Sequence, residues 1–167
     1  MVISDVAEQR AERVAVLVYL SAFLLPVGVT PPEVMQGDPA SQLAAALDVD
    51  RARGVTTVRP ERARDVFYHD CDDATAAWAV GRLQPEPIVP RATVPDGPTR
   101  TAARFGRVPR VYIECLNDRA LGLATQRRMQ ATLPCARVYE LPTSHSPFLS
   151  APEALARHLL DAATWAQ

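Results

Sequence analysis

The side chains best suited to chemistry follow two apolar runs towards the end of the chain. Asp118 comes shortly after the run 110–115, and His145 comes shortly after the run 136–141. A carboxylate can fix the tautomer of an imidazole and stabilise its protonated form, while the other ring nitrogen takes a proton from a nucleophile. Ligands of open α/β sheets bind outside the carboxyl ends of the strands. If both runs are strands, Asp118 and His145 are predicted to act as a paired acid and base.

Each of these residues also has a simpler explanation when it is taken alone. A single histidine after a strand is more often a capped-turn or surface residue than a base. Asp118 could equally cap the following helix or pair with Arg119 or Arg127. The chain order, with the acid after one strand and the base after the next, is what favours a catalytic pair.

Hydrophobic patterns predict the elements that must position this pair. Residues 14–20 are apolar on both faces and rich in β-branched side chains, as expected for a central strand of a parallel sheet. Two more strands are predicted at 110–115 and 136–141, each followed by a helical pattern, and Ser150 with Glu153 predicts a capping box for the last helix. Alternating strands and helices are typical of βαβ units. The predicted fold class is therefore α/β, with a parallel sheet and flanking helices.

The segment 26–107 differs from the rest in composition. It carries most of the 15 prolines, and turn signals separate two short helical patterns within it. One helix is predicted from Asp38-Pro39 onward and another after Asp72 or Asp73, because both begin with a capping residue. We expect this segment to be an inserted, mainly helical cap over the strand ends, between core parts at 1–25 and 108–167.

Composition excludes several classes of function. The chain has 167 residues, 48% of them hydrophobic, and a formal net charge of −1. Such a chain can form one compact core, and its charge argues against a protein that binds nucleic acid or a membrane surface. All 18 basic residues are arginine, which excludes lysine Schiff bases and phosphate-binding P-loops.

Cysteine usage and hydropathy bear on the cellular location. Three cysteines without close pairing favour neither a disulfide framework nor a zinc site. We see no signal peptide and no apolar run long enough to span a bilayer. A cytoplasmic protein without a bound metal is therefore expected.

Four stretches of the sequence are similar to one known family. “LVYLSAFLLP”, “FYHDC”, “PRVYIECLNDRALGLATQRRM” and “VYELPTSHSPFLSAPEALARHLL” together resemble the hydroxynitrile lyase and methyl esterase branch of the α/β-hydrolases, including its bacterial relatives. The resemblance implies a core sheet, a cap inserted after 14–20, and a Ser-Asp-His triad that needs no cofactor. Asp118 and His145 match the acid and the base of that triad.

The resemblance also implies a ligand pocket and an activity. Phe23 and Trp78 are the candidate pocket residues for a small apolar ester or an aromatic ligand, although ordinary core positions explain both residues better. Lyases of this family use a lysine directly after the catalytic histidine, where this chain has Ser146. Ester hydrolysis is therefore the better match.

The nucleophile of the family has no counterpart in this sequence. In the family the serine lies in a G-x-S-x-G turn just before a helix that resembles “MVISDVAEQ”, and no G-x-S-x-G occurs here. We expect the chain to begin after that turn and to represent a partial α/β-hydrolase fold. Ser4 lies in the first predicted helix, while Ser144 and Ser146 adjoin His145, so none is expected to replace the nucleophile.

Two hypotheses follow from the sequence. In the first, the chain is the C-terminal portion of an ester hydrolase and is inactive without its serine. In the second, it is a non-catalytic protein that binds a small molecule or a partner. Strand 14–20 is expected to have an unpaired edge that pairs with another copy of the chain or with an N-terminal fragment.

Overall fold

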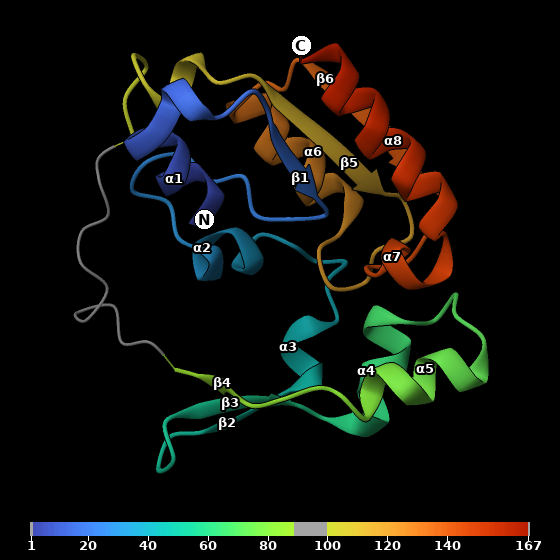
Figure 1. The fold of residues 1–167 in the computed structure, drawn as a ribbon. Helices are drawn as coiled ribbons and strands as arrows, with labels where there is room; N and C mark the ends of the chain where they lie inside the picture. The colour runs from blue at the N-terminus through green and yellow to red at the C-terminus, as the bar shows by residue number, and fades with distance from the viewer. Residues whose placement is uncertain (1, 89–99, 167) are drawn as a thin grey trace.

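Three parallel strands form the central sheet of the computed structural model, which describes residues 2–88 and 100–166. In the order of the sheet they are β1 (Leu17–Leu20), β5 (Arg110–Cys115) and β6 (Arg137–Leu141). Both pairs of neighbours are parallel. The predicted parallel sheet is confirmed, and β1 lies at its edge (Figure 1).

Helices cover both faces of this sheet (Figure 1). They are α1 (Val2–Arg10), the short 3-10 turn η1 (Ala11–Arg13), α6 (Leu123–Thr132), α7 (Pro147–Ser150) and α8 (Pro152–Trp165). Ala7 of α1 and Met129 of α6 pack with Tyr19 and Tyr112 on one face. Leu155 of α8 packs on the opposite face in a separate cluster. Because successive side chains of a strand point to opposite faces, both faces of β5 are buried.

Helix α8 begins differently from the sequence prediction. Ala151 is the residue before the helix, no side chain caps the helix, and Ser150 is the last residue of α7. The predicted capping box at Ser150 and Glu153 is therefore wrong. Pro152 at the first helical position needs no partner for its missing N–H, which explains why the helix starts there without a cap.

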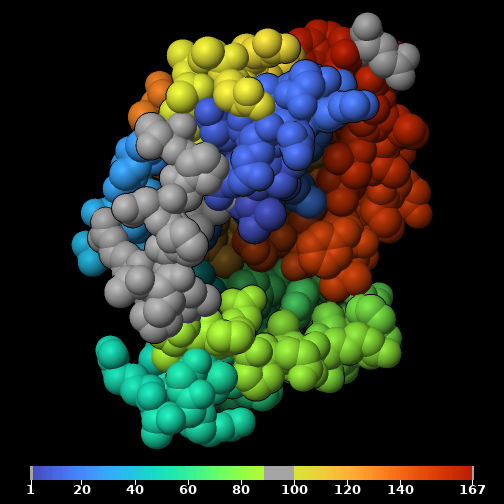
Figure 2. All heavy atoms as spheres, turned by 60° about the vertical axis from the view of Figure 1, so that its left-hand side comes forward, coloured from blue at the N-terminus to red at the C-terminus, as the bar shows by residue number. Residues whose placement is uncertain are grey.

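A second layer lies at the carboxyl ends of the strands, towards which the strand arrows point (Figure 1). It contains α3 (Leu43–Ala46), β2 (Leu47–Asp50), β3 (Val55–Val58), α4 (Pro60–Phe67), α5 (Asp73–Val80) and β4 (Glu86–Pro87). We call residues 43–88 the cap layer. Figure 2 shows it, in teal to green, below the blue and red surfaces of the core.

The cap layer contains an antiparallel sheet, which the prediction of a mainly helical cap did not include. Strand β3 pairs with β2 on one side and β4 on the other. The β-branched run Val55–Val58 favours a strand. Gly54 has a φ of +66° in the turn between β2 and β3, a conformation that glycine adopts without steric cost.

The two predicted cap helices had different outcomes. Asp72 caps α5 as predicted, because its carboxylate accepts a hydrogen bond from Thr75 N at 2.8 Å. No helix starts at Asp38-Pro39, where the carboxylate of Asp38 accepts instead from Gly122 N at 2.8 Å. Asp38 therefore ties the chain before the cap layer to the turn after β5.

The flanks of the predicted insertion 26–107 pack on the core. Val34 and Met35 of α2 (Pro31–Gln36) contact the core cluster that includes Tyr19. After the cap layer, Thr101 and η3 (Phe105–Arg107) attach to Glu8 of α1. Only the cap layer stands apart from the sheet. In the part of the chain that the structure describes, no helix is long and apolar enough to cross a membrane.

Candidate active site

Asp118 and His145 meet at the carboxyl ends of β5 and β6. His145 Nδ1 lies 2.7 Å from Asp118 Oδ2. The two strands are parallel neighbours, with Cys115 opposite Leu141, so their following loops emerge at the same edge of the sheet. The predicted hydrogen bond and the predicted positions of the pair are both confirmed.

The Asp118 carboxylate is completely buried and accepts four hydrogen bonds. Oδ1 accepts from Ala120 N at 2.7 Å and from Leu121 N at 2.9 Å. Oδ2 accepts from His145 and from the hydroxyl of Ser21. An ionised carboxylate has enough lone pairs to accept from all four donors. Asp118 thus closes the turn after β5 and binds the imidazole at the same time.

The arginines that sequence analysis considered for Asp118 bind elsewhere. The Arg119 guanidinium donates to Asp65 O at 3.2 Å. Arg127 pairs with Glu114 and Glu140. The partners of the Asp118 carboxylate are therefore the imidazole of His145, the Ser21 hydroxyl and two backbone amides of its own turn.

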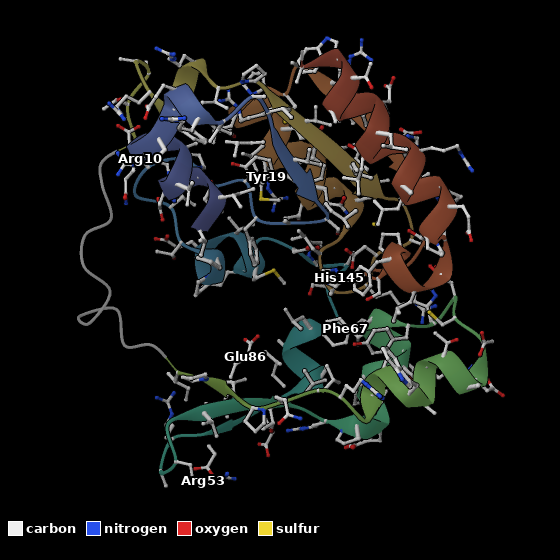
Figure 3. All side chains as sticks on the ribbon, in the orientation of Figure 1. Arg10, Tyr19, Arg53, Phe67, Glu86 and His145 are labelled. Atoms are coloured by element: carbon white, nitrogen blue, oxygen red, sulfur yellow. The ribbon has the colours of Figure 1, made fainter. Side chains whose placement is uncertain are left out.

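The second nitrogen of His145 is available for chemistry. Nδ1 faces the carboxylate of Asp118, and within the described residues no hydrogen bond reaches Nε2. The side chain is 31% exposed. Because a carboxylate oxygen accepts, Nδ1 is the donor in this contact, and Nε2 is the ring nitrogen left to face a substrate or nucleophile. The ring of Phe67 contacts the imidazole edge to face, with 5.5 Å between the ring centroids (Figure 3).

Two cavities adjoin this imidazole. The larger has a volume of about 550 Å³ and lies on the cap side, with Thr57, Leu83 and Phe148 in its wall. The smaller has a volume of about 400 Å³ and lies on the core side, with Phe23 in its wall. Leu43, Phe67 and His145 line both cavities. A ligand in either cavity would reach the imidazole of His145.

The two expected pocket residues lie in different surroundings. Phe23 lines the smaller cavity and also packs against the core. Trp78 lines neither cavity, is 52% exposed, and lies under the Arg82 guanidinium, whose carbon is 4.0 Å from the ring centroid. Helix α5 packs through Ala76 and Ala79, which turns Trp78 towards solvent. Trp78 therefore lies outside the two cavities beside His145, and its role in a ligand pocket stays a prediction.

Ser21 is a site residue that sequence analysis missed. It directly follows β1, has a φ of 35°, and donates its hydroxyl to Asp118 Oδ2. A positive φ is uncommon outside glycine and often marks a functional site. The signal was present in the sequence, because Ser21 follows an apolar run as Asp118 and His145 do.

Two serine hydroxyls that sequence analysis considered are engaged in hydrogen bonds, and one buried thiol is unreactive. Ser4 bonds the phenol of Tyr19 at 2.8 Å, and the Ser144 hydroxyl donates to Phe67 O at 2.9 Å. Cys115 at the end of β5 is fully buried, and burial raises the pKa of its thiol to about 11. A thiol with that pKa is a poor nucleophile at neutral pH. In the described residues, no group of three or more His, Cys, Asp or Glu side chains is placed to hold a metal ion.

The fold and the acid–base pair together define an α/β-hydrolase. The model of the alpha/beta hydrolase family matches residues 1–158, and the chain belongs to this family. It is 37% identical to a pyrethroid hydrolase from Sphingobium wenxiniae over 95% of this chain and 58% of the relative. It is 28% identical to methylesterase 17 of Arabidopsis thaliana over 91% of this chain and 58% of the relative.

A solved structure supports the fold independently. Tomato methylketone synthase I in complex with 2-tridecanone superimposes with a TM-score of 0.82 at 22% identity, over 99% of this chain and 67% of that chain. At this identity the likeness establishes the fold alone. The chain spans about 58% of the length of the two curated relatives, so the fold it shows is a partial α/β-hydrolase fold.

Proposed function

We propose that this chain carries the acid and the base of a carboxylic ester hydrolase. The observation that carries the proposal is the 2.7 Å contact between His145 Nδ1 and Asp118 Oδ2 beside two cavities. The names of the curated relatives, a pyrethroid hydrolase and a methylesterase, support ester hydrolysis. In the family branch that the sequence resembles, lyases have a lysine directly after the catalytic histidine, whereas this chain has Ser146 there. This difference disfavours cyanohydrin cleavage.

The proposed mechanism uses both nitrogens of the imidazole. Nε2 of His145 takes the proton of a serine hydroxyl as that oxygen attacks the ester carbonyl, and then gives the proton to the leaving alcohol. Asp118 holds the Nδ1 proton and stabilises the imidazolium that forms. A small apolar ester or an aromatic ester would place its two sides in the two cavities, with Phe23 against one of them.

We assign the serine nucleophile and the oxyanion donors to a segment outside these 167 residues. Support comes from the 58% coverage of the curated relatives and from the position of β1 at the edge of the sheet. The outer edge of β1 would pair with a strand of that segment. On this proposal the chain by itself does not hydrolyse esters.

A chimera tests the proposal. We would join this chain to the part of the Sphingobium pyrethroid hydrolase that it does not match, and measure hydrolysis of p-nitrophenyl acetate. We expect turnover that falls by about 10⁴-fold in both the His145→Ala and the Asp118→Asn chimeras, because triad members act as a unit. Val49→Ala is a control, since Val49 is 50% exposed on β2 and is not among the residues that line the two cavities.

Three results would count against the proposal. Turnover that survives His145→Ala would exclude this histidine as the base. Loss of turnover in Val49→Ala to the same degree would show general disruption of the fold. A folded chimera that binds an ester without hydrolysing it would favour the alternative, a non-catalytic binding protein with a hydrolase-derived fold.

A further inference from the structure

One short segment of the cap layer is bonded to the loop that carries the base. Residues 67–70 begin at the last residue of α4, and the Ser144 amide donates to Asp70 Oδ2 at 2.7 Å. The Ser144 hydroxyl donates to Phe67 O at 2.9 Å. Ser144 directly precedes His145, so both ends of this segment hold the residue next to the imidazole.

The same segment is bonded to the loop that carries the acid. His69 Nε2 lies 3.0 Å from Asn117 O. A carbonyl oxygen only accepts, so this nitrogen of His69 donates. Asn117 directly precedes Asp118. The 67–70 segment therefore contacts both strand-end loops, in each case at the residue just before the catalytic pair.

Phe67 adds a direct contact with the base. Its ring meets the imidazole of His145 edge to face, and Figure 3 shows the two labelled side chains next to each other between the core and the cap layer. Because Phe67 is also the carbonyl acceptor for Ser144, a movement of the segment would change the loop and the ring contact together.

Asp70 supplies the charged acceptor in this arrangement. Ser144 is 0% exposed, so its amide needs a partner, and the carboxylate of Asp70 is that partner. Burial alone would raise the pKa of Asp70. Hydrogen bonds from Ser144 act in the opposite direction, and the pKa of Asp70 lies below its usual value. The carboxylate is therefore charged at neutral pH, although the residue itself is exposed at the surface.

We propose that Asp70 is a positioning residue that holds His145 in place against Asp118 by binding the Ser144 amide. It reaches from the cap layer to the core, where its carboxylate binds the Ser144 amide, and in the described residues no hydrogen bond joins it to Asp118 or His145. Its effect on hydrolysis rests on the proposed function, whereas its effect on the imidazole does not. The cap layer therefore helps to orient the imidazole of His145, in addition to lining the larger cavity.

The test is an NMR comparison of the chain with and without Asp70→Ala, in the absence of substrate, with Val6→Arg introduced in both proteins to favour the monomer. We expect the Ser144 amide to exchange about fivefold faster, because a buried donor loses its acceptor. We also expect the ring-proton resonances of His145 to move, since they sense the ring of Phe67. Asp70→Asn should give intermediate values, because an amide oxygen accepts a weaker hydrogen bond than a carboxylate.

Asp73→Ala is the matched control. Asp73 is an exposed aspartate of the same layer that pairs with Arg64 and does not contact the core loops. A folded Asp70→Ala protein with wild-type His145 resonances would overturn the proposal, as would equal effects of Asp73→Ala. If Asp70→Ala does not fold, Asp70→Asn decides, and wild-type exchange at Ser144 would then overturn it. Since no substrate is used, failure here is distinguishable from failure of the proposed hydrolysis.

Discussion

The hydroxyl of Ser21 donates to Oδ2 of Asp118, although 97 positions separate the two residues in the chain. The same oxygen accepts from Nδ1 of His145. Ser21 follows β1, Asp118 follows β5 and His145 follows β6. Each strand of the central sheet thus contributes one side chain to a single hydrogen-bonded cluster, and the parallel register of the sheet is what brings them together.

The first prediction concerns the activity of the chain by itself. The purified chain should show no measurable hydrolysis of short aryl esters, because the pair can polarise water but has no serine to activate. The measurement is p-nitrophenol release above the rate in buffer, with His145→Ala as the comparison. Turnover that disappears in His145→Ala would show an active nucleophile or water mechanism within the chain and would contradict the proposal.

The second prediction concerns the stability that Asp118 provides. Asp118→Ala should lower the free energy of unfolding by about 3 kcal/mol, because it leaves the buried amides of Ala120 and Leu121 without an acceptor. Ser21→Ala removes one hydrogen bond to the same carboxylate and should cost about 1 kcal/mol. Urea unfolding measures both values. If Asp118→Ala costs less than Ser21→Ala, the carboxylate does not stabilise the turn as described.

The third prediction is a pH dependence centred on Glu8. The Thr101 amide, at 2.7 Å, is the main cause that lowers the pKa of Glu8; burial opposes it, and the Phe105 amide adds to it. A carboxyl with a lowered folded pKa gives stability that is present above its unfolded pKa, about 4.3, and is lost as pH falls through the folded value. The wild-type chain should therefore lose stability below about pH 4.3.

Glu8→Gln tests this assignment. The variant should be less stable than wild type at pH 7, and the difference should shrink as the pH is lowered towards about 3, where Glu8 itself is increasingly protonated. Glu12→Gln is the control, because the Glu12 side chain is 54% exposed and makes only a loose ion pair with Arg104 at 3.6 Å. A difference between wild type and Glu8→Gln that stays constant with pH would contradict the prediction.

The sequence predicts the elements whose side chains are buried on both faces. Strand β5 has the predicted bounds, because all but its first residue are buried and the run is apolar apart from Arg110 and Glu114. Strand β6 begins one residue later than predicted. Strand β1 starts at Leu17 instead of Val14, since only residues 17–20 pair with β5. Asp118 and His145 could be picked out from the sequence because each lies shortly after one of these predicted strands, and a position after a strand can be recognised from the neighbouring residues alone.

Contacts between distant segments are what the sequence does not predict. Strand β2 has both ends half-buried and its middle exposed, so it lacks the alternation that would mark it. Trp78 lies outside the two cavities because helix α5 packs through its alanines. Hydrophobicity alone would instead select the tryptophan as the buried residue of this helix. The contact between Asp70 and Ser144 joins positions 74 residues apart and leaves no periodic signal in either segment.

The last prediction concerns the free edge of the sheet. Leu17 N and Ser21 N both bond towards β5, at 2.9 Å and 3.0 Å, so the intervening Val18 and Leu20 direct their backbone groups outward. Val6 of the neighbouring helix α1 is 47% exposed. An edge strand bordered by exposed apolar side chains, with no proline or charge within it, is a surface that pairs with another strand.

The isolated chain should therefore self-associate at micromolar concentration or stay poorly soluble, and size-exclusion chromatography with light scattering measures this directly. Val6→Arg should shift the chain towards the monomer, because it places a charge beside the edge. Val49→Arg is the matched control, since Val49 is a valine of similar exposure, 50% against 47%, on β2 of the cap layer. A monodisperse, cooperatively unfolding wild-type monomer would contradict the assignment of β1 as a pairing edge. Recovery of a soluble, ester-hydrolysing complex on co-expression with the unmatched part of the pyrethroid hydrolase would instead show that a strand from that part is the natural occupant of this edge.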